Sequence, residues 1–269
     1  MSPLALLTMS IALAAGPAAG SGPEIIAHRG ESHDAPENTL TAFRLAWDRD
    51  VGAIELDVHL TADDRLVCIH DAATKRVCGV NKVVKTSRYD DLKSLDAGSW
   101  KGQEFAGERL PLLEEALAAI PPGRRCFIEV KVGPEAVPPL QRVVRDSGLP
   151  PDQLVVISFK EATIAEVRRQ LPELRAYWLA SFKQNERTGE FTPTVDDLIA
   201  TARKIDAHGI NVSYKGPIDA EFVRRVREAG LGLYVWTVDD EREARRLKAL
   251  GVEGITTNRE QWLRGTLAE

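Results

Sequence analysis

The chain has 269 residues, of which 43% are hydrophobic and 28% are charged, and its formal net charge is −5. This acidic balance and the lack of a long basic run exclude a general nucleic-acid-binding protein, but they do not exclude a pocket for a small anion. The residues after the first twenty, about 250 in number, are enough for one α/β barrel or for two smaller domains.

The first twenty residues contain no charged side chain. An apolar run over Leu4–Ala15 is followed by the small residues Ala18-Ala19-Gly20, which is typical of a secretory signal peptide, although no Lys or Arg precedes the run. The run is short for a membrane span, which needs about 20 apolar residues. We therefore expect residues 1–20 to be a signal peptide and residues 21–269 to form one exported domain, periplasmic or extracellular, without a stable membrane span. An uncleaved anchor and a misassigned start are the alternatives.

The first predicted strand covers residues 25–28. After it, the Asn38-Thr39 pair offers an N-cap for a helix. Leu40, Phe43 and Trp47 then fall at positions i, i+3 and i+7, which places them on one face of that helix.

The second predicted strand covers residues 53–57. Because side chains alternate along a strand, Glu55 and Asp57 share one face. The opposite face is apolar and contains Ile54, Leu56 and Val58.

The polar segment Thr61–Arg65 is too short for a crossover helix and has the chemistry of a turn. We therefore expect residues 58–60 and 66–69 to pair as a β-hairpin. A turn centred between its third and fourth residues places His70 opposite Asp57. The hairpin thus returns a histidine to the level of the carboxylates.

Residues 72–110 are polar and lack clear periodicity, which predicts a long excursion over the site, since loops of this length are usually functional. Regular units follow it. Gly209, Gly230 and Gly251 are 21 residues apart, and each precedes an apolar strand, as expected of a left-handed residue that ends a helix. Helices are predicted at 111–120, 161–171, 195–207, 218–229 and 240–250.

Eight strands are predicted when the hairpin arm at 66–70 is not counted as a barrel strand, and nearly every strand is followed by a helix. This pattern predicts a (β/α)₈ TIM barrel, with a small insertion after a hairpin that extends the second strand. An open doubly wound sheet is the alternative. The expected strands are 25–28, 53–57, 126–131, 154–158, 175–179, 210–213, 233–237 and 253–257.

Three carboxylates, Glu55, Asp57 and Glu129, are expected at the carboxyl ends of barrel strands and facing inward. Burying them together without compensation is costly, and a divalent cation removes the repulsion. Ligands that are all oxygen suit Mg²⁺ or Ca²⁺ better than Zn²⁺. The structural alternative is that Glu55 or Glu129 only pairs with a lysine or arginine at the barrel mouth, such as Lys131.

Two histidines, His28 and His70, flank the expected metal site and suit a general base and a general acid. Arg29 and Lys131 supply positive charge where a phosphate oxygen is expected to bind. Trp236, at the end of its strand, is expected to form a wall of the pocket. Together these groups indicate phosphoryl transfer.

Three cysteines allow at most one disulfide, and their spacing fits no zinc site. A bridge between Cys68 and Cys78 is compatible with an oxidising compartment. We favour buried free thiols for these two residues and for Cys126.

This set of residues resembles the glycerophosphodiester phosphodiesterase family over residues 25 to about 260. The family fold is the (β/α)₈ barrel with a small insertion after the hairpin. The resemblance rests on His28-Arg29-Gly30, Pro36-Glu37-Asn38-Thr39, Glu55-x-Asp57, His70-Asp71, Glu129-x-Lys131, Ser158-Phe159 and Val235-Trp236-Thr237.

The resemblance implies that one divalent cation, Ca²⁺ or Mg²⁺, is bound by the three carboxylates, Glu55, Asp57 and Glu129. It further implies an acid/base pair formed by His28 and His70, phosphate contacts from Arg29 and Lys131, and a pocket that includes Trp236.

The expected reaction is the metal-dependent hydrolysis of a small glycerophosphodiester to glycerol 3-phosphate and an alcohol, through a cyclic phosphate intermediate. In this reaction we expect His28 to act as the base and His70 as the acid. The alternatives are a phospholipase that acts on intact lipids or lysolipids, and a non-catalytic protein that binds phosphodiesters.

The chain departs from the family pattern at three positions. Asp239 stands where the family usually has Asn, Thr256-Thr257-Asn258 replaces a segment that usually contains Asp, and Cys78 stands where a threonine is common. We expect none of these positions to touch the metal ligands or the histidine pair.

Overall fold

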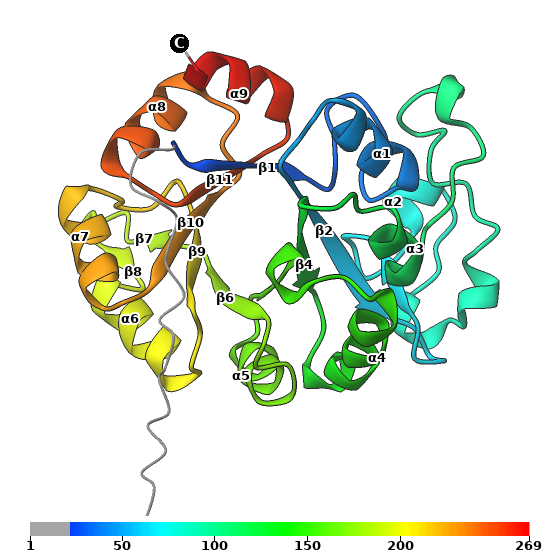
Figure 1. Cartoon of the computed structure of the whole chain (residues 1–269), viewed down its shortest axis with the longest axis horizontal. Coiled ribbons are helices and arrows are strands. Elements are labelled where there is room, and N and C mark those ends of the chain that lie inside the picture. The colour runs from blue at the N-terminus through cyan, green and yellow to red at the C-terminus, as the bar shows by residue number, and fades with distance from the viewer. Residues whose placement is uncertain (1–21, 269) are drawn as a thin grey trace, which may run out of the picture.

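The computed structural model describes residues 22–268, so the predicted signal peptide lies outside the described residues. Eight parallel strands follow the order β1-β11-β10-β9-β6-β5-β4-β2, and β1 also pairs with β2, which closes the barrel. The predicted (β/α)₈ barrel is therefore confirmed, with its helices outside the strands (Figure 1). The barrel strands are β1 (Glu24–His28), β2 (Ala53–Leu60), β4 (Arg125–Val130), β5 (Leu154–Ser158), β6 (Arg175–Ala180), β9 (Gly209–Ser213), β10 (Gly232–Trp236) and β11 (Gly254–Thr257).

The outer helices begin where the sequence supplies caps. The Thr39 side chain accepts a hydrogen bond from the backbone N–H of Ala42 at 3.2 Å, as expected of the N-cap of α1. Two helices, α4 and α9, had not been assigned from sequence; α4 carries prolines in its first turn, where a missing N–H costs nothing. The helices are α1 (Leu40–Asp48), α3 (Leu113–Ala118), α4 (Val137–Ser147), α5 (Glu161–Gln170), α6 (Val195–Lys204), α7 (Ala220–Glu228), α8 (Glu241–Leu250) and α9 (Glu260–Ala268). In residues 22–268, no helix has the length and apolar character needed to cross a membrane.

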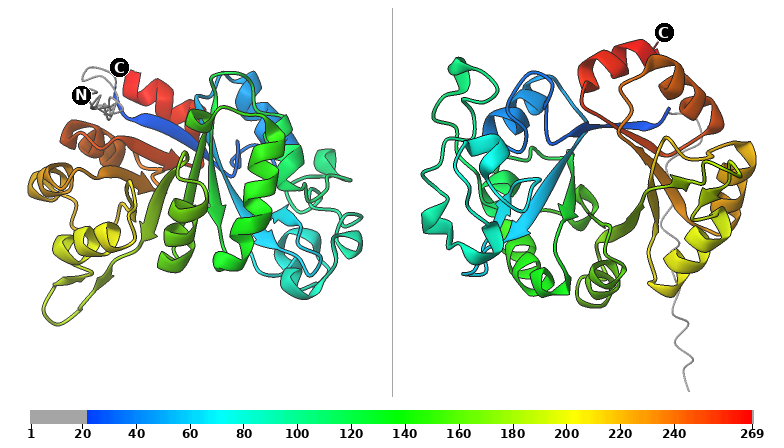
Figure 2. Two further views of the ribbon diagram at one scale, coloured as in Figure 1. Left: turned by 60° about the horizontal axis from the view of Figure 1, so that its bottom comes forward. Right: turned by 180° about the vertical axis from the view of Figure 1, so that it is seen from behind.

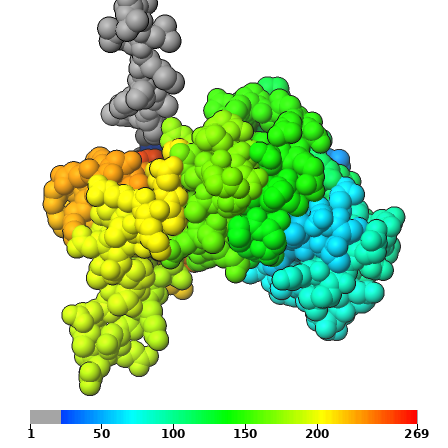
Figure 3. Space-filling view, turned by 90° about the horizontal axis from the view of Figure 1, so that it is seen from below, coloured from blue at the N-terminus to red at the C-terminus, as the bar shows by residue number. Residues whose placement is uncertain are grey.

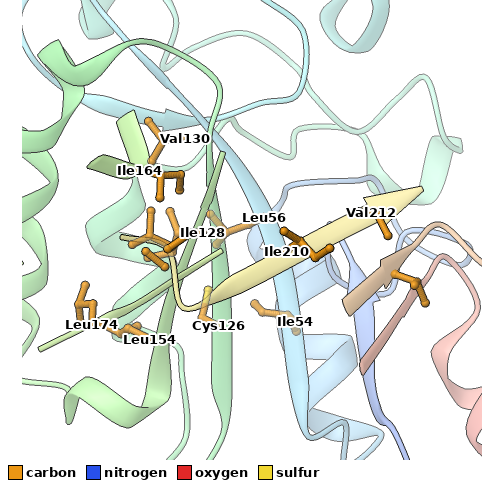
Figure 4. Packing of buried hydrophobic residues seen from close by; sticks show 14 of the residues in the cluster. Ile54, Leu56, Cys126, Ile128, Val130, Leu154, Ile164, Leu174, Ile210 and Val212 are labelled. Carbon is orange, nitrogen blue, oxygen red and sulfur yellow. The ribbon is translucent and has the colours of Figure 1, made fainter. Parts of the chain in front are cut away.

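Alternating side chains along each strand divide the core into two layers. Ile54 and Leu56 of β2 belong to the large apolar cluster between the strands and the helices, part of which is shown in Figure 4. Ala53 of the same strand packs inside the barrel with Phe127 and Tyr177. The predicted alternation therefore holds, and the inward face is the one that carries the acidic residues of β2.

The hairpin that extends β2 pairs in a different register from the predicted one. Val58 lies opposite Cys68 of β3 (Leu66–Cys68), so Ile69, and not His70, is level with Asp57. The reason is a three-residue turn whose last residue, Asp64, is left-handed with a φ of 57°. His70 nevertheless reaches the barrel mouth, because the chain leaves the sheet just beyond β3.

The insertion at residues 72–110 consists of short helical turns around a small apolar core of its own. It contains α2 (Lys75–Cys78) and three 3₁₀ turns, η1 (Val84–Thr86), η2 (Tyr89–Asp91) and η3 (Gln103–Phe105). The side chains of Val77, Val84 and Leu92 pack together with Val67 and Ile69 of the hairpin arm. The insertion is thereby anchored on the segment that ends in His70.

A second projection follows β6. The strands β7 (Lys183–Gln184) and β8 (Phe191–Thr192) form a short antiparallel hairpin that had not been predicted. The hairpin extends away from the barrel in the left view of Figure 2. In Figure 3 it projects, in yellow-green, on the same side of the molecule as the cyan insertion, with a hollow between them.

Only two of the three regularly spaced glycines have the predicted conformation. Gly230 and Gly251 are left-handed, with φ values of 76° and 78°. The prediction for Gly209 is wrong, because this residue is the first of β9 and the left-handed turn before it falls at Asp206. A Cβ atom at position 209 would lie 2.3 Å from the carbonyl oxygen of Gly232, so glycine is required there by close packing inside the barrel.

All three cysteines are free in the structure. Cys68 and Cys126 are buried, as expected, whereas Cys78 is only partly buried. Burial raises the pKa of the Cys68 and Cys126 thiols well above its ordinary value, which makes both unreactive.

Candidate active site

The residues predicted to carry chemistry gather at the carboxyl ends of the barrel strands. A pocket of about 260 Å³ opens there, and Asp57 lies buried against two of its lining residues, Arg29 and Lys131. The other side of the pocket is largely apolar. Of the eight predicted residues, those that line the pocket are His28, Arg29, Glu55, His70, Glu129, Lys131 and Trp236.

The three carboxylates form one buried acidic cluster. Glu55, Asp57 and Glu129 each place one carboxylate oxygen so that all three atoms lie within 4.8 Å of one another. Burial and the neighbouring Asp57 raise the pKa of Glu55 well above its ordinary value and that of Glu129 to about 7. Burial has the same tendency at Asp57, but Lys131 and Arg29 outweigh it and lower the pKa of that carboxyl to about 2.

The cluster fits a divalent cation better than a set of ordinary ion pairs. Lys131 Nζ lies 2.7 Å from Glu129 Oε1 and 3.2 Å from Asp57 Oδ1 but does not pair with Glu55. Among the described residues, Glu55 Oε1 is buried without any hydrogen-bond partner. A buried carboxylate oxygen without a partner, beside two further carboxylates, is a ligand set that suits Mg²⁺ or Ca²⁺.

Asp57 also organises the cationic side of the site. Arg29 Nε lies 3.1 Å from Asp57 Oδ2, and Asn38 Nδ2 donates a hydrogen bond of 2.8 Å to the same oxygen. The Asn38 side chain also accepts a hydrogen bond from the backbone N–H of Asp57. Arg29 and Asn38 both have left-handed backbones, so the loop after β1 bends to bring them over the carboxylate.

The histidines are each held through Nδ1. His28 Nδ1 lies 2.6 Å from Asn258 Oδ1, while its Nε2 lies 3.8 Å from Glu55 Oε2. Burial and the nearby Arg29 lower the pKa of His28 to about 4. His70 Nδ1 lies 2.7 Å from a carboxylate oxygen of Asp71. Both rings therefore keep Nε2 free of a hydrogen bond among the described residues.

A network of hydrogen bonds supports His70 and Arg29, and sequence reasoning missed two of its members. Arg76 of the insertion donates hydrogen bonds to Asp71 and to Glu37, and Glu37 also accepts one from Arg29 Nη1 at 2.9 Å. His59 Nε2 lies 3.0 Å from the carbonyl oxygen of His70. Arg76 and His59 were missed because each acts through another residue, a relationship that spacing alone does not reveal.

One expectation about the departures from the family pattern is wrong. Asn258 contacts His28, and its Nδ2 donates a hydrogen bond of 2.6 Å to Asp239, so two of the departures face each other beside the histidine. The two residues follow neighbouring strands, β10 and β11, whose carboxyl ends meet at the barrel mouth. Their separation by 19 positions in the sequence conceals this contact.

An aromatic wall closes the apolar side of the pocket. The rings of Phe159 and Trp236 meet edge to face with centroids 5.6 Å apart. Trp236 Nε1 donates a hydrogen bond to the carbonyl oxygen of Asn211, which fixes the indole. Ile157 and Leu179 continue the wall, and Phe159 is 44% exposed, so this surface is available to a ligand.

The fold and this site together define a (β/α)₈-barrel enzyme whose pocket is lined by acidic, cationic and histidine side chains. The model of the glycerophosphoryl diester phosphodiesterase family matches residues 28–261, and the chain belongs to this family of enzymes. A glycerophosphodiester phosphodiesterase of Caldanaerobacter subterraneus subsp. tengcongensis is 32% identical over 241 residues, which are 87% of this chain and 93% of that protein.

Two further relatives agree with this assignment. A glycerophosphodiester phosphodiesterase of Bacillus subtilis is 30% identical over 250 residues, covering 87% of this chain and 82% of that protein. A phosphodiesterase of Oleispira antarctica, solved in complex with the product sn-glycerol-3-phosphate, has a TM-score of 0.81 and 26% identity. That comparison covers 92% of this chain and 98% of the other.

Proposed function

We propose that this protein hydrolyses small glycerophosphodiesters to sn-glycerol 3-phosphate and an alcohol, with the help of one divalent cation. The observation that carries the proposal is the buried cluster of Glu55, Asp57 and Glu129, which lies beside two cationic side chains and two histidines in one pocket. The sn-glycerol-3-phosphate bound to the Oleispira antarctica relative supports the same choice of product.

The three carboxylates are the proposed ligands of Ca²⁺ or Mg²⁺. When bound, such a cation supplies positive charge to the phosphate and lowers the pKa of a neighbouring hydroxyl. Arg29 and Lys131 are the proposed phosphate-binding residues. Both stay protonated, because the nearby Asp57 keeps the pKa of each above its ordinary value despite burial.

The two histidines are proposed to move the protons. His28 Nε2 accepts the proton of the glycerol hydroxyl next to the phosphate as that oxygen attacks phosphorus. The bond from phosphorus to the alcohol oxygen breaks on the opposite side, and His70 donates a proton to this oxygen. The product of this step is a cyclic glycerol phosphate.

Water then opens the ring with the roles of the histidines exchanged. His70 accepts a proton from water as the water oxygen attacks phosphorus, and His28 returns its proton to the glycerol oxygen that leaves. The assignment of His28 as base and His70 as acid in the first step is supported by the residues that contact Nδ1 of each ring. The neutral amide of Asn258 suits a neutral imidazole that accepts a proton, whereas the carboxylate of Asp71 suits a protonated imidazole that donates one.

The apolar wall of Phe159 and Trp236 is proposed to face the alcohol part of the substrate. This wall is also the observation that favours the first alternative, a phospholipase, because an exposed aromatic surface can bind part of an acyl chain. The second alternative, a non-catalytic binder, has no specific support, since both histidines and all three carboxylates line or underlie the pocket.

A substrate panel distinguishes these functions. Release of sn-glycerol 3-phosphate from glycerophosphocholine is measured beside hydrolysis of lysophosphatidylcholine, each with Mg²⁺, with Ca²⁺ and with chelator. We expect rapid, cation-dependent hydrolysis of the water-soluble diester. Preferential hydrolysis of the lysolipid would identify a phospholipase, and tight binding of either compound without turnover would identify a binding protein.

A further inference from the structure

Three hydrogen-bond donors converge on the carboxylate of Asp239. The hydroxyl of Thr257 and the backbone N–H of Asn258 both donate to Oδ1 at 2.8 Å, and Asn258 Nδ2 donates to Oδ2 at 2.6 Å. Asp239 lies beyond the end of β10 and Asn258 directly after β11, so the two parallel strands bring the pair together. Neither residue lines the substrate pocket.

The carboxylate of Asp239 determines which way the Asn258 amide points. An ionised carboxylate can only accept hydrogen bonds, so the amide must turn its NH₂ group toward Asp239. Its carbonyl oxygen, Oδ1, then faces His28 Nδ1 at 2.6 Å. Since a carbonyl oxygen also only accepts, the proton of the neutral imidazole must be on Nδ1.

We propose that Asp239 and Asn258 are positioning residues that hold His28 in the tautomer with its proton on Nδ1. Nε2, which faces the acidic cluster 3.8 Å from Glu55 Oε2, then carries the lone pair that accepts a proton from the attacking hydroxyl. This inference rests on the proposed role of His28 as the base. It assigns a role in the reaction to two residues that do not line the pocket. They act through the relay, the chain of hydrogen bonds from Asp239 to Asn258 to His28.

The single substitution Asp239→Asn tests the direction of the relay. The Oδ1 position must remain an acceptor for Thr257 and the backbone N–H of Asn258, so the NH₂ group of the substituted side chain faces the Asn258 amide. That amide must then flip and present its own NH₂ group to His28 Nδ1. This stabilises the tautomer with the proton on Nε2, which cannot act as the base. We expect kcat to fall by about 100-fold or more, with KM changed less than about threefold.

Exchanging the two side chains restores the same pattern of donors and acceptors. Asn258→Asp alone places two carboxylates against each other and should also lower kcat. In the double variant, the amide introduced at position 239 donates to the carboxylate introduced at position 258, and this carboxylate accepts from His28 Nδ1–H. We therefore expect kcat within about tenfold of the wild type. Asp240→Asn is the matched control, because it removes the same charge one residue further on and keeps a good N-cap for α8.

The ¹⁵N chemical shifts of the His28 ring nitrogens provide a readout that does not depend on activity. They are recorded on the full chain without substrate and are assigned as the signals that disappear in His28→Ala. We expect Nδ1 to be protonated in the wild type, the double variant and Asp240→Asn, and Nε2 to be protonated in Asp239→Asn. An unchanged tautomer in Asp239→Asn would overturn the relay and leave the proposed function intact. The expected tautomers in a wild-type protein without phosphodiesterase activity would support the relay and overturn the proposed function.

Discussion

Arg76, in the insertion, is joined to Glu37, in the loop before α1, by two hydrogen bonds of 2.9 and 2.7 Å. The same guanidinium donates to Asp71, whose other contact is with His70 Nδ1 at 2.7 Å. Glu37 also accepts a hydrogen bond from Arg29. A single side chain of the insertion therefore holds the partners of a candidate catalytic histidine and of a candidate phosphate-binding arginine.

The first prediction concerns this link. Arg76→Ala leaves the carboxylates of Glu37 and Asp71 without their shared partner, so we expect kcat/KM to fall about tenfold or more while the fold is retained. Arg76→Lys should recover only part of the activity, because an ammonium group cannot make the same set of paired hydrogen bonds. Arg88→Ala, at a 68% exposed arginine of the same insertion, is the control. Equal activity of Arg76→Ala and Arg88→Ala would contradict the proposed role of the link.

The second prediction separates the roles of the two histidines. Because His70 is the proposed donor of a proton to the leaving alcohol, His70→Ala should regain activity on a glycerophosphodiester with a p-nitrophenol leaving group, which needs no proton. His28→Ala should stay inactive on both substrates. Rescue of His28→Ala instead would reverse the assignment. Equal cleavage of a diester that lacks the neighbouring hydroxyl would exclude the cyclic intermediate.

The third prediction concerns stability and pH. The Glu260 side chain, at the start of α9, is buried, and burial together with the nearby Glu31 raises its pKa to about 7, although Arg264 partly offsets this. The folded chain therefore keeps this proton up to about pH 7, whereas the unfolded chain loses it near pH 4.5. The free energy of unfolding thus falls as pH rises through this window.

Replacing Glu260 with Gln removes that dependence. At pH 8 we expect Glu260→Gln to be more stable than the wild type by about 1–3 kcal/mol, and at pH 5 we expect a smaller difference. Urea unfolding at the two pH values measures this. Glu228→Gln, at an exposed position of α7, should have the same free energy of unfolding as the wild type at both pH values. A stabilisation that does not change with pH would show that Glu260 ionises normally in the folded protein.

The fourth prediction concerns export. We propose that residues 1–20 are removed by a signal peptidase, because their uncharged apolar run ends in small residues. N-terminal sequencing of the protein isolated from its native source should then find a mature chain that begins near Ser21, outside the cytoplasm. Recovery of an intact Met1 in the cytosolic fraction would contradict export.

Much of the fold and the site could be predicted from two features. Strand periodicity determines which face of a strand each side chain takes, and barrel topology determines which strand ends meet. Alternation along β2 placed Glu55 and Asp57 inside the barrel and Ile54 among the helices. Since the carboxyl ends of all eight strands meet at one mouth, residues as distant as His28 and Trp236 could be assigned to one pocket.

The features that could not be predicted depend on single backbone conformations or on contacts between distant loops. The left-handed Asp64 shortens the turn and shifts the hairpin register by one residue. Position 209 requires glycine because it packs closely against Gly232, a contact that the regular spacing of the glycines does not reveal. The contact of Asn258 with His28 spans 230 positions, and nothing in the segment around Asn258 marks it as a partner of the histidine.

We propose above all that the acidic cluster holds a divalent cation that hydrolysis requires. The most direct test is to measure sn-glycerol 3-phosphate release and thermal unfolding of the wild type and Glu55→Gln, with Mg²⁺, with Ca²⁺ and with chelator. Glu55 is the choice because no lysine or arginine side chain pairs with it in residues 22–268, so its removal relieves repulsion without leaving a buried cation unpaired.

We expect the wild type to be active and thermally stabilised only when the cation is present. Glu55→Gln should be folded and at least as stable as the wild type in chelator, should lack activity, and should gain little stability from either cation. Full activity of the wild type in chelator, or equal stabilisation of both proteins by the cation, would contradict the proposed metal site.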